Sequence, residues 1–488
     1  MGRNHGDDPG ALMPFSGLFG GTLSRRRMLQ GAAVGAGAIS LAGLGSRVAS
    51  AQDSGANDVT GAFDWKRNSG TSIKALLNNH PYQEALIADL AAFSELTGIE
   101  VTYDVFPENN YFDKLTVDLT SGQPTYDVFM LGAYMVWQYG PPGYLEDMQP
   151  WIQNASATSP DYDWEDIFPN LRSATQWSLK TGDPLGTGGQ YALPWGFETN
   201  TVAYNKEVFD KLGKQPAETF DELIALAADL NEAAPGAGYD GMYGIGTRGS
   251  RQWATIHPGY MTMYSRLGGK DFDMVDGTLT PVMNSDIGVD FTQKWATMMK
   301  DSGPANWTNY FWYDVGNDFG AQKSAMMFDA DIASFFQNQP GAGVASGKIA
   351  WHTGPKGPDG SLLTNQWIWS LGMGAKSQNK SAAWLFLQWA TGKDHLLKAA
   401  TTSGNHVDPI RQSILDNTDF QTKMGANMDY LTTFNAIIDQ TKILFTPQPQ
   451  FFEATTLWAG ALQEVYGGSD ARETMDDLVS QIEDEVSA

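Results

Sequence analysis

The sequence predicts an α/β fold with at least two lobes, and three observations support this prediction. The chain has 488 residues, a length that at roughly 150 residues per domain suits two or three domains. Its composition is 42% hydrophobic and 12% aromatic, which is typical of a globular protein and not of a disordered one. Strand and helix patterns alternate along the chain, as in a parallel sheet with helices packed on its faces.

The alternation begins in the order strand, helix, strand, helix, strand. Residues 72–77 form a short apolar run. Pro81 then suits the first position of a helix whose apolar residues share one stripe, and Gly98 closes that helix. The elements predicted next are strands at 99–105 and 126–131 and a helix at 111–120.

Later segments continue the same alternation. Thr219 and Glu222 match a capping box at the start of a helix, and Ser285 suits the cap of another. Trp312 and Tyr313 lie in a segment rich in Asn, Gly and Asp, which predicts a loop. The other predicted elements are strands at 190–194, 201–205, 325–328, 348–352 and 366–372, and a helix at 381–391 that Gly392 ends.

The first fifty residues match an export signal. Arg25 and Arg26 precede a Gly/Ala-rich apolar stretch at 31–44, and small residues follow up to Ala51. A membrane-spanning helix is the alternative, but about 14 apolar residues fall short of the roughly 20 that a span needs. The paired arginines predict a twin-arginine signal, read by the Tat export machinery and cleaved after Ala51. We therefore expect a soluble periplasmic protein.

Charge and cysteine content exclude several classes of function. The formal net charge is −25 at pH 7, which disfavours nucleic acid and anionic membrane surfaces as partners. The chain contains no cysteine, which excludes disulfides, thiolate zinc sites, iron–sulfur clusters and a cysteine nucleophile. We also expect no lipoprotein anchor, because such an anchor is attached to a cysteine.

No motif for catalysis or for a cofactor stands out, and we expect no cofactor. The six histidines include no pair at the spacing of a zinc-binding helix, and no G-x-S-x-G nucleophile turn occurs. Residues 244–249 match G-x-G-x-x-G, but far from the first strand–helix–strand unit, where a dinucleotide would bind. We interpret them as a flexible turn after a strand, and Asp271 and Asp273 as part of a solvated loop.

Aromatic residues at strand ends and turns are the features that point to a ligand. Trp367 and Trp369 alternate within one predicted strand, so both face the same side of the sheet. A flat ring stacks on the C–H face of a sugar or polyol, while nearby polar groups bond the hydroxyls. Core packing is the alternative interpretation for any single ring, so the prediction rests on the set. The set comprises Tyr134, Trp137, Trp195, Phe197, Trp312, Tyr313, Trp367 and Trp369.

Eight segments, taken in order, resemble one family. They include a Y-D-V-F-M-L run, a Y-A-L-P-W run and a D-P-I-R-Q-S run, and they lie at 126–131, 191–195, 202–209, 219–223, 322–327, 367–372, 379–389 and 408–413. Together they are similar to the extracellular solute-binding proteins of ABC sugar and polyol importers, the family that includes maltose-binding-protein-like chains. The resemblance covers about residues 60 to 480.

The resemblance implies a two-lobed fold in which each lobe is a mainly parallel sheet flanked by helices. Three crossovers would form a hinge, and a sugar or polyol bound in the cleft would favour the closed form that the ABC permease recognises. It implies a monomeric binding protein and not an enzyme. The lobes it implies are an N-terminal lobe of 58–195 plus 366–412 and a C-terminal lobe of 200–362 plus 413–488.

The resemblance also implies which residues hold the ligand. The tryptophans would stack on it and the charged side chains would bond its hydroxyls, near the amides that begin the helix at Pro81. The position after Leu131, often acidic in this family, is Gly132 here. The implied ligand residues are Asn79, His80, Tyr134, Trp137, Trp195, Glu198, Asp329, Asp331, Trp367, Trp369 and Arg411, with Arg248 and Trp312 as further candidates.

A secreted glycoside hydrolase is the alternative function. Such an enzyme needs two carboxylates about 5–10 Å apart across the scissile bond. Asp329 and Asp331 would bring two carboxylates near one another, but no motif identifies a catalytic pair. A binding protein is therefore the favoured prediction.

Overall fold

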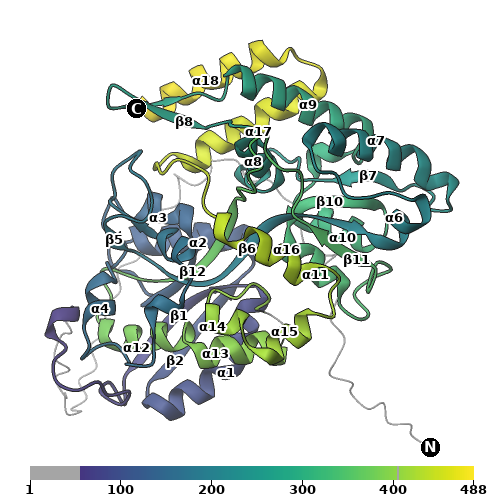
Figure 1. Ribbon diagram of the computed structural model, residues 1–488. Coiled ribbons are helices and arrows are strands. Elements are labelled where there is room, and N and C mark those ends of the chain that lie inside the picture. Colours follow the sequence, from purple (N-terminus) through teal and green to yellow (C-terminus); the bar gives the residue numbers. More distant parts are fainter. Residues whose placement is uncertain (1–54, 404–405, 488) are drawn as a thin grey trace, which may run out of the picture. The chain divides into compact units, whose positions relative to one another are not determined.

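The computed structural model describes residues 55–403 and 406–487 (Figure 1). The predicted export signal and its cleavage site after Ala51 lie outside the described residues. In the described ranges no helix combines the length and the apolar character that a membrane crossing requires. The predicted α/β fold is confirmed, because strands and helices alternate through both halves of the chain.

The first five predicted elements are confirmed in their order. They are β1 (Ser72–Asn78), α1 (Pro81–Thr97), β2 (Glu100–Phe106), α2 (Glu108–Thr120) and β3 (Val128–Gly132). Helix α1 has proline at its first position and ends at Gly98, whose φ of 73° is left-handed. Strand β1 pairs in parallel with β2 on one side and with β3 on the other.

A single long strand, β6 (Leu193–Asn205), runs through the middle of the sheet. Its first half pairs antiparallel with β12 (Gln366–Met373), and its second half pairs antiparallel with β10 (Ser324–Ala330). The prediction of two separate strands, at 190–194 and 201–205, is wrong. Almost every residue of β6 is buried, whichever face it points to, so no alternation of polar and apolar residues marks it as one strand.

Strand β6 joins two groups of strands into one path. The order is β2-β1-β3-β12-β6-β10-β7, with β7 (Tyr243–Gly246) at the end and β11 (Ile349–His352) also paired to β6. The pairs β1–β2, β1–β3 and β10–β7 are parallel, and the pairs that involve β12, β6 or β11 in between are antiparallel. The sheet is therefore parallel towards both ends and antiparallel in the middle.

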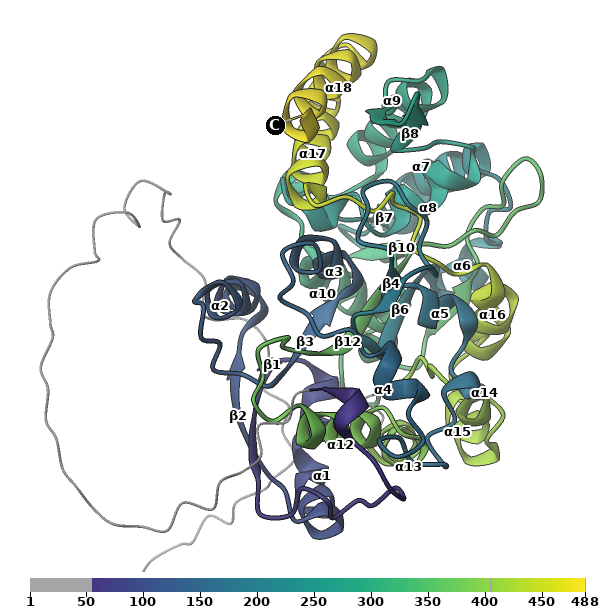
Figure 2. The same cartoon turned by 90° about the vertical axis from the view of Figure 1, so that its left-hand side faces the viewer.

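Helices cover both faces of each strand group. Around β1–β3, helices α1 and α12 (Lys380–Ala390) lie on one side, and α2 and α3 (Ala133–Tyr139) lie on the other (Figures 1 and 2). Around β7 and β10, helices α7 (Phe220–Gly236) and α9 (Asp286–Ser302) lie on one side, and α10 (Trp312–Gly320) and α11 (Asp331–Asn338) lie on the other (Figures 1 and 2). Each group is thus a sheet between two helical layers.

Several local predictions in the second half are confirmed and one is wrong. The capping box of Thr219 and Glu222 opens α7, and the Ser285 side chain caps α9. Trp312 and Tyr313 do not lie in a loop, because they begin α10. The Asp314 carboxylate accepts the backbone N–H of Phe311 at 2.9 Å and so stabilises the first turn of this glycine-containing helix.

The remaining elements are short strands and the helices that follow the sheet. The strands are β4 (Gln176–Trp177), β5 (Gly189–Gln190), β8 (Phe272–Val275) and β9 (Thr278–Pro281). The helices are α4 (Gln149–Gln153), α5 (Pro169–Ser173), α6 (Lys206–Leu212), α8 (Gly259–Arg266), α13 (Lys393–Lys398), α14 (Gln412–Leu415), α15 (Thr418–Met424), α16 (Tyr430–Ile437), α17 (Phe451–Gly467) and α18 (Ala471–Ser487).

Two segments predicted to be loose are packed. The first three residues of the G-x-G-x-x-G segment lie within β7, and the rest follow it. Cβ atoms at Gly244 and Gly249 would lie 1.9 Å from Ala227 O and 2.3 Å from Trp307 O. These glycines therefore serve close packing and not flexibility. Asp271 is buried, not solvated, and its carboxylate accepts the Thr446 backbone N–H at 2.8 Å.

Candidate functional site

The carboxyl ends of strands from both groups meet around the middle of β6. Ala330, the last residue of β10, pairs with Asn200 of β6. Gly132, the last residue of β3, pairs with Trp369 of β12. In open α/β sheets, ligands bind outside the carboxyl ends of the strands. Glu198 of β6 lies at this meeting point and is the centre of the candidate site.

Glu198 is a protonated carboxyl at neutral pH. Burial raises its pKa to about 8, and Arg248 lowers the pKa without offsetting burial. The indole Nε1 of Trp369 donates a hydrogen bond to Glu198 Oε1 at 3.2 Å. A protonated carboxyl both donates and accepts hydrogen bonds, as a hydroxyl of a ligand does.

His80 presents an N–H group towards Glu198. It caps helix α1, where its Nδ1 accepts the backbone N–H of Tyr82 at 3.2 Å. Burial lowers the pKa of His80 to about 3, so the ring is neutral, and an accepting Nδ1 leaves the proton on Nε2. Nε2 lies 4.0 Å from Glu198 Oε1. This contact is therefore not an ion pair, and the N–H points into the site.

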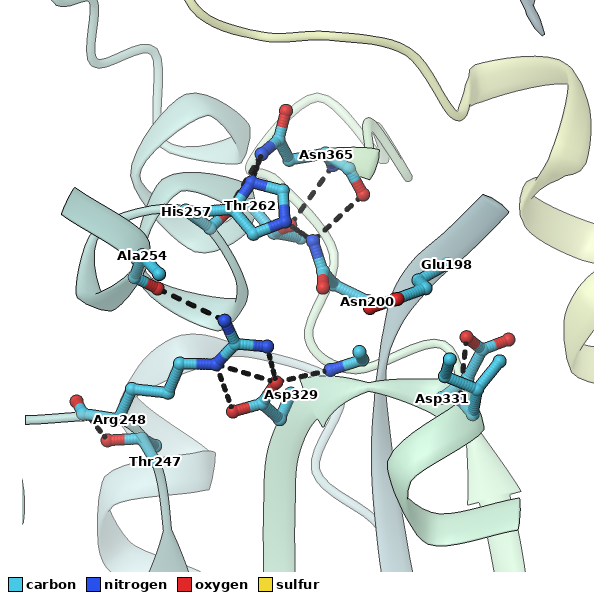
Figure 3. Close-up of polar contacts among 12 residues, drawn as sticks. Glu198, Asn200, Thr247, Arg248, Ala254, His257, Thr262, Asp329, Asp331 and Asn365 are labelled. Carbon is cyan, nitrogen blue, oxygen red and sulfur yellow. Dashed lines mark hydrogen bonds and ion pairs between the residues drawn. The ribbon is translucent and has the colours of Figure 1, made fainter. Parts of the chain in front are cut away.

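Arg248, which follows β7, and Asp329 of β10 form a buried ion pair beside the strand that carries Glu198 (Figure 3). Arg248 Nε lies 3.1 and 3.0 Å from the two carboxylate oxygens, and Nη2 lies 2.6 Å from Oδ1. Arg248 Nη1 also donates to Ala254 O at 3.3 Å. Burial lowers the pKa of Arg248, but Asp329 raises it by more, so the guanidinium stays charged. The pair cancels its own charge.

Glu108, the first residue of α2, adds a second carboxyl from the other strand group. Burial raises the pKa of Glu108, while Arg248 and the Asn78 side chain lower it. Asn78 is the last residue of β1 and is fully buried. The polar part of the site therefore combines groups from the ends of β1 and β10, the middle of β6, the starts of α1 and α2, and the turn after β7.

Four rings, Tyr134, Trp253, Trp367 and Phe451, form an aromatic wall beside these polar groups. The Trp367 ring centroid lies 5.6 Å from that of Tyr134 and 5.3 Å from that of Trp253. Tyr134 stacks on Phe451 at 4.1 Å. Tyr134 belongs to α3, Phe451 begins α17 and Trp253 follows β7, so the wall joins segments far apart in the sequence.

Gly132 is required by the aromatic wall. A Cβ atom at this position would lie 2.2 Å from Cη2 of Trp367, which is too close for any side chain. The indole therefore occupies the space in which an acidic side chain would stand. This packing is the physical reason for the glycine after Leu131.

Two further carboxyls lie buried behind β6. The hydroxyl of Tyr430 contacts Asp331 Oδ2 at 3.1 Å and also Asp408 Oδ1. Burial raises the pKa of both carboxyls, and a hydrogen bond between them lowers the pKa of Asp331 and raises that of Asp408. Asp331 Oδ1 also accepts the backbone N–H of Thr199 at 3.1 Å. The two carboxyls therefore form a coupled buried pair that resists carrying two negative charges.

Comparison with known proteins identifies the family. The model of the bacterial extracellular solute-binding proteins matches residues 78–395. The chain belongs to this family. Solute-binding proteins of this family deliver their ligands to an ABC permease and are not enzymes, so nothing supports the alternative of a glycoside hydrolase. Membership in an extracellular family also implies a place of action outside the cytoplasm.

Three relatives illustrate the similarity. The chain is 49% identical over 458 residues to the erythritol/L-threitol-binding protein of Mycolicibacterium smegmatis, and the match covers 92% of this chain and 94% of the relative. A solute-binding protein of Agrobacterium vitis with bound D-mannitol has a TM-score of 0.71 at 21% identity, over 86% of this chain and 99% of that one. One of Agrobacterium radiobacter in complex with ribitol has a TM-score of 0.72 at 20% identity, over 85% and 98%. The two structures establish the two-lobed fold.

In this family member, more than half of the predicted ligand residues come together. Glu198 and Trp369 share a hydrogen bond, and the other residues surround them. The residues brought together are His80, Tyr134, Glu198, Arg248, Asp329, Trp367 and Trp369.

Three predicted ligand residues pack within the protein. Arg411 is fully buried and donates to Thr391 O at 3.0 Å and to Asp163 O at 2.9 Å. Trp195 is fully buried with its ring 5.4 Å from that of His406. Trp137 is fully buried behind the aromatic wall, 5.1 Å from Tyr134.

The last three predicted ligand residues lie at the margins of the site. The Asn79 side chain is exposed, and its backbone N–H donates to Phe106 O at 2.8 Å. Asp331 belongs to the buried carboxyl pair described above. Trp312 begins α10 and is half-buried, with its ring centroid 5.8 Å from that of Tyr313.

Sequence reasoning missed four residues of the site. Asn78 and Glu108 could have been found from their positions, because Asn78 ends strand β1 and Glu108 begins the helix after β2, at the edge of the sheet where ligands bind. Trp253 and Phe451 carry no such signal. They lie in segments whose position next to Trp367 and Tyr134 is fixed by long-range packing.

Proposed function

We propose that this protein binds a small neutral polyol, of the erythritol or L-threitol class, and delivers it to an ABC permease. The observation that carries the proposal is the protonated Glu198 at the centre of the site, beside the neutral His80 and the self-neutralised pair of Arg248 and Asp329. The 49% identity to an erythritol/L-threitol-binding protein supports the same ligand class.

The hydrogen-bonding groups of the site match those of a polyol. Every hydroxyl of a polyol can donate and accept one or more hydrogen bonds. Glu198 offers a donor and an acceptor, His80 offers Nε2–H, and the amide of Asn78 offers both kinds of group. Glu198, His80 and the pair of Arg248 and Asp329 present no net charge to the ligand at neutral pH, which suits an uncharged molecule better than a sugar acid or a sugar phosphate.

Ligand binding would close two lobes on each other, an N-terminal lobe of 58–195 plus 366–412 and a C-terminal lobe of 200–362 plus 413–488. The change of pairing partner along β6 supports this division, because Thr199 pairs with β12 and Asn200 with β10. The Tyr134 hydroxyl contacts His257 Nδ1 at 2.9 Å and would bridge the two lobes in the closed form.

The remaining parts of the proposal concern export and assembly. Arg25, Arg26 and the small residues up to Ala51 support export through the Tat machinery, with cleavage after Ala51. The exported protein would act in the periplasm as a monomer that meets the transmembrane subunits of its permease. Mass spectrometry of the exported protein would give its first residue, which the proposal sets at Gln52.

A thermal-shift series tests the ligand class. Residues 52–488 are melted with erythritol, L-threitol, ribitol, D-mannitol and maltose, each over a range of concentrations. A ligand at 100 times its Kd stabilises the native state by about 2.7 kcal/mol. The proposal requires the largest rise in Tm from a four-carbon polyol. A larger rise with ribitol, D-mannitol or maltose than with either four-carbon polyol would overturn it.

A further inference from the structure

The surface left inside the site is small and lies at its polar end. Among the residues around the centre, Glu198 retains 13% of its side-chain surface, His80 9%, Arg248 7% and Trp367 6%. Trp369 retains only 2%, beneath the Glu198 carboxyl. A ligand in contact with these groups is therefore confined to the neighbourhood of Glu198.

Trp367 blocks the direction that leads away from Glu198 along β12. Its indole covers Gly132, where even a methyl group would overlap it. It also lies 5.1 Å from Trp369 and 5.6 Å from Tyr134, measured between ring centroids. Rings on three sides hold Trp367 in this position, so it cannot turn aside without disturbing β3 or α3.

Trp253 completes the block from the opposite strand group. It begins the short helix Trp253–Thr255 after β7, and its ring lies 5.3 Å from that of Trp367 at an interplanar angle of 37°. Phe452 of α17 supports it edge-on at 5.3 Å. Trp253 is partly exposed, unlike the buried Trp367.

Polar atoms beside this block are already bonded to each other. Tyr134 Oη and His257 Nδ1 lie 2.9 Å apart, and Asn365 Nδ2 lies 3.0 Å from the same His257 nitrogen. A longer ligand that extended towards Trp253 would bring a hydroxyl against indole carbon without a partner for it. Burying an unpaired hydroxyl weakens binding strongly.

We propose that Trp253 and Trp367 determine specificity by ligand length, because they close the aromatic end of the site and leave room for a four-carbon polyol at the Glu198 end. This inference rests on the proposed function, since it concerns the length of the polyol. In it Trp367 acts as the fixed part of the block, and Trp253 as the part that approaches with the C-terminal lobe.

The test compares the Kd of erythritol, L-threitol, ribitol and D-mannitol for the wild type, Trp253→Ala and Trp253→Phe by isothermal titration calorimetry. Trp65→Ala is the matched control, because Trp65 is also a partly exposed tryptophan and its ring contacts Phe63. We expect Trp253→Ala to shift the ratio of the mannitol Kd to the erythritol Kd by about tenfold or more towards mannitol. Trp253→Phe is expected to shift it less, and Trp65→Ala to leave it unchanged.

The outcomes separate this inference from the proposed function. If the wild type binds no polyol, the proposed function is wrong. If the wild type prefers four-carbon polyols and both Trp253 variants weaken all four ligands by the same factor, only the inference about length is wrong. Should Trp253→Ala unfold, as its Tm would reveal, the ratio measured for Trp253→Phe decides alone: an unchanged ratio overturns the inference.

Discussion

Arg248 holds both carboxylate oxygens of Asp329, with its Nε at 3.1 and 3.0 Å and its Nη2 at 2.6 Å from Oδ1. Asp329 lies near the carboxyl end of β10, and Arg248 follows the neighbouring strand β7. The pair therefore connects two adjacent strands at the site. Both side chains are buried, and such a pair depends on each partner for its charge.

Breaking this pair is expected to destabilise the protein severely. Asp329→Asn leaves a buried guanidinium without its counter-charge, and we expect a loss of about 3–5 kcal/mol in the free energy of unfolding. The matched control is Asp210→Asn, which breaks the exposed pair with Lys206 and is expected to cost less than about 1 kcal/mol. Urea unfolding of both variants measures the difference. Equal losses of unfolding free energy in the two variants would contradict a buried ion pair between Arg248 and Asp329.

The protonated state of Glu198 predicts how stability depends on pH. The pKa is raised from 4.5 to about 8 in the folded protein, so the native state holds an extra proton between these values. Stability from this group is complete below about pH 4.5, falls as the pH rises and is lost above about pH 8, with a total change of up to about 4–5 kcal/mol.

Glu198→Gln isolates the contribution of Glu198 to the pH dependence of stability, because glutamine has nearly the same shape as glutamate and does not titrate. The groups that face Glu198 are Arg248, Glu108, Asp331 and the neutral His80, and they remain in the variant. We expect urea unfolding to show that the wild type loses more stability than Glu198→Gln when the pH is raised from about 5 to about 9. Parallel pH curves for the two proteins would refute a protonated Glu198.

The carboxyl pair behind β6 gives a prediction about two similar substitutions. Asp408→Asn keeps an oxygen for the Tyr430 hydroxyl and removes one of two adjacent buried carboxyls, so it is expected to cost about 1 kcal/mol. Asp331 accepts the backbone N–H groups of Thr199 and Ile332 through one oxygen, so Asp331→Asn disturbs more bonds and is expected to cost about 2–3 kcal/mol. Differential scanning calorimetry ranks the two, and the reverse order would show that the backbone bonds of Asp331 do not set the cost.

Gly132→Ala tests the packing of Trp367. The new methyl group would overlap the indole, and overpacking of this kind costs about 1–3 kcal/mol. Gly236→Ala is the control, since a Cβ at the end of α7 meets nothing within 4 Å. We expect lower Tm and weaker polyol binding only for Gly132→Ala. An unchanged Tm would show that the Trp367 side chain can adopt another conformation without loss of stability.

The elements that the sequence predicted correctly carry local signals. Helix α1 has Pro81 at its start and Gly98 at its end, and α7 has the box of Thr219 and Glu222, so each boundary is set by residues a few positions apart. Strand β6 and helix α10 lack such signals. Burial on both faces hides the period of β6, and the Asn, Gly and Asp of α10 favour a loop until packing decides.

The polar centre of the site was more predictable than its walls. His80 precedes helix α1 and Asp329 lies near the end of β10, and the order of strands and helices in the sequence predicts that such positions share one edge of the sheet. Glu198 lies in β6, where this edge meets the other strand group. The burial of Trp195 and Arg411 and the approach of Trp253 to Trp367 depend on contacts between residues far apart in the chain. Nothing local distinguishes a tryptophan in the core from one in a binding site.

Calorimetric titration of erythritol and of L-threitol into residues 52–488 tests the central claim most directly. The account predicts saturable binding at one site per chain, with the polyol recovered chemically unchanged and binding weakened at least tenfold in Glu198→Ala, which removes a charge-free hydrogen-bonding group from the centre of the site. Absence of binding for both four-carbon polyols, or their conversion to another compound, would contradict it.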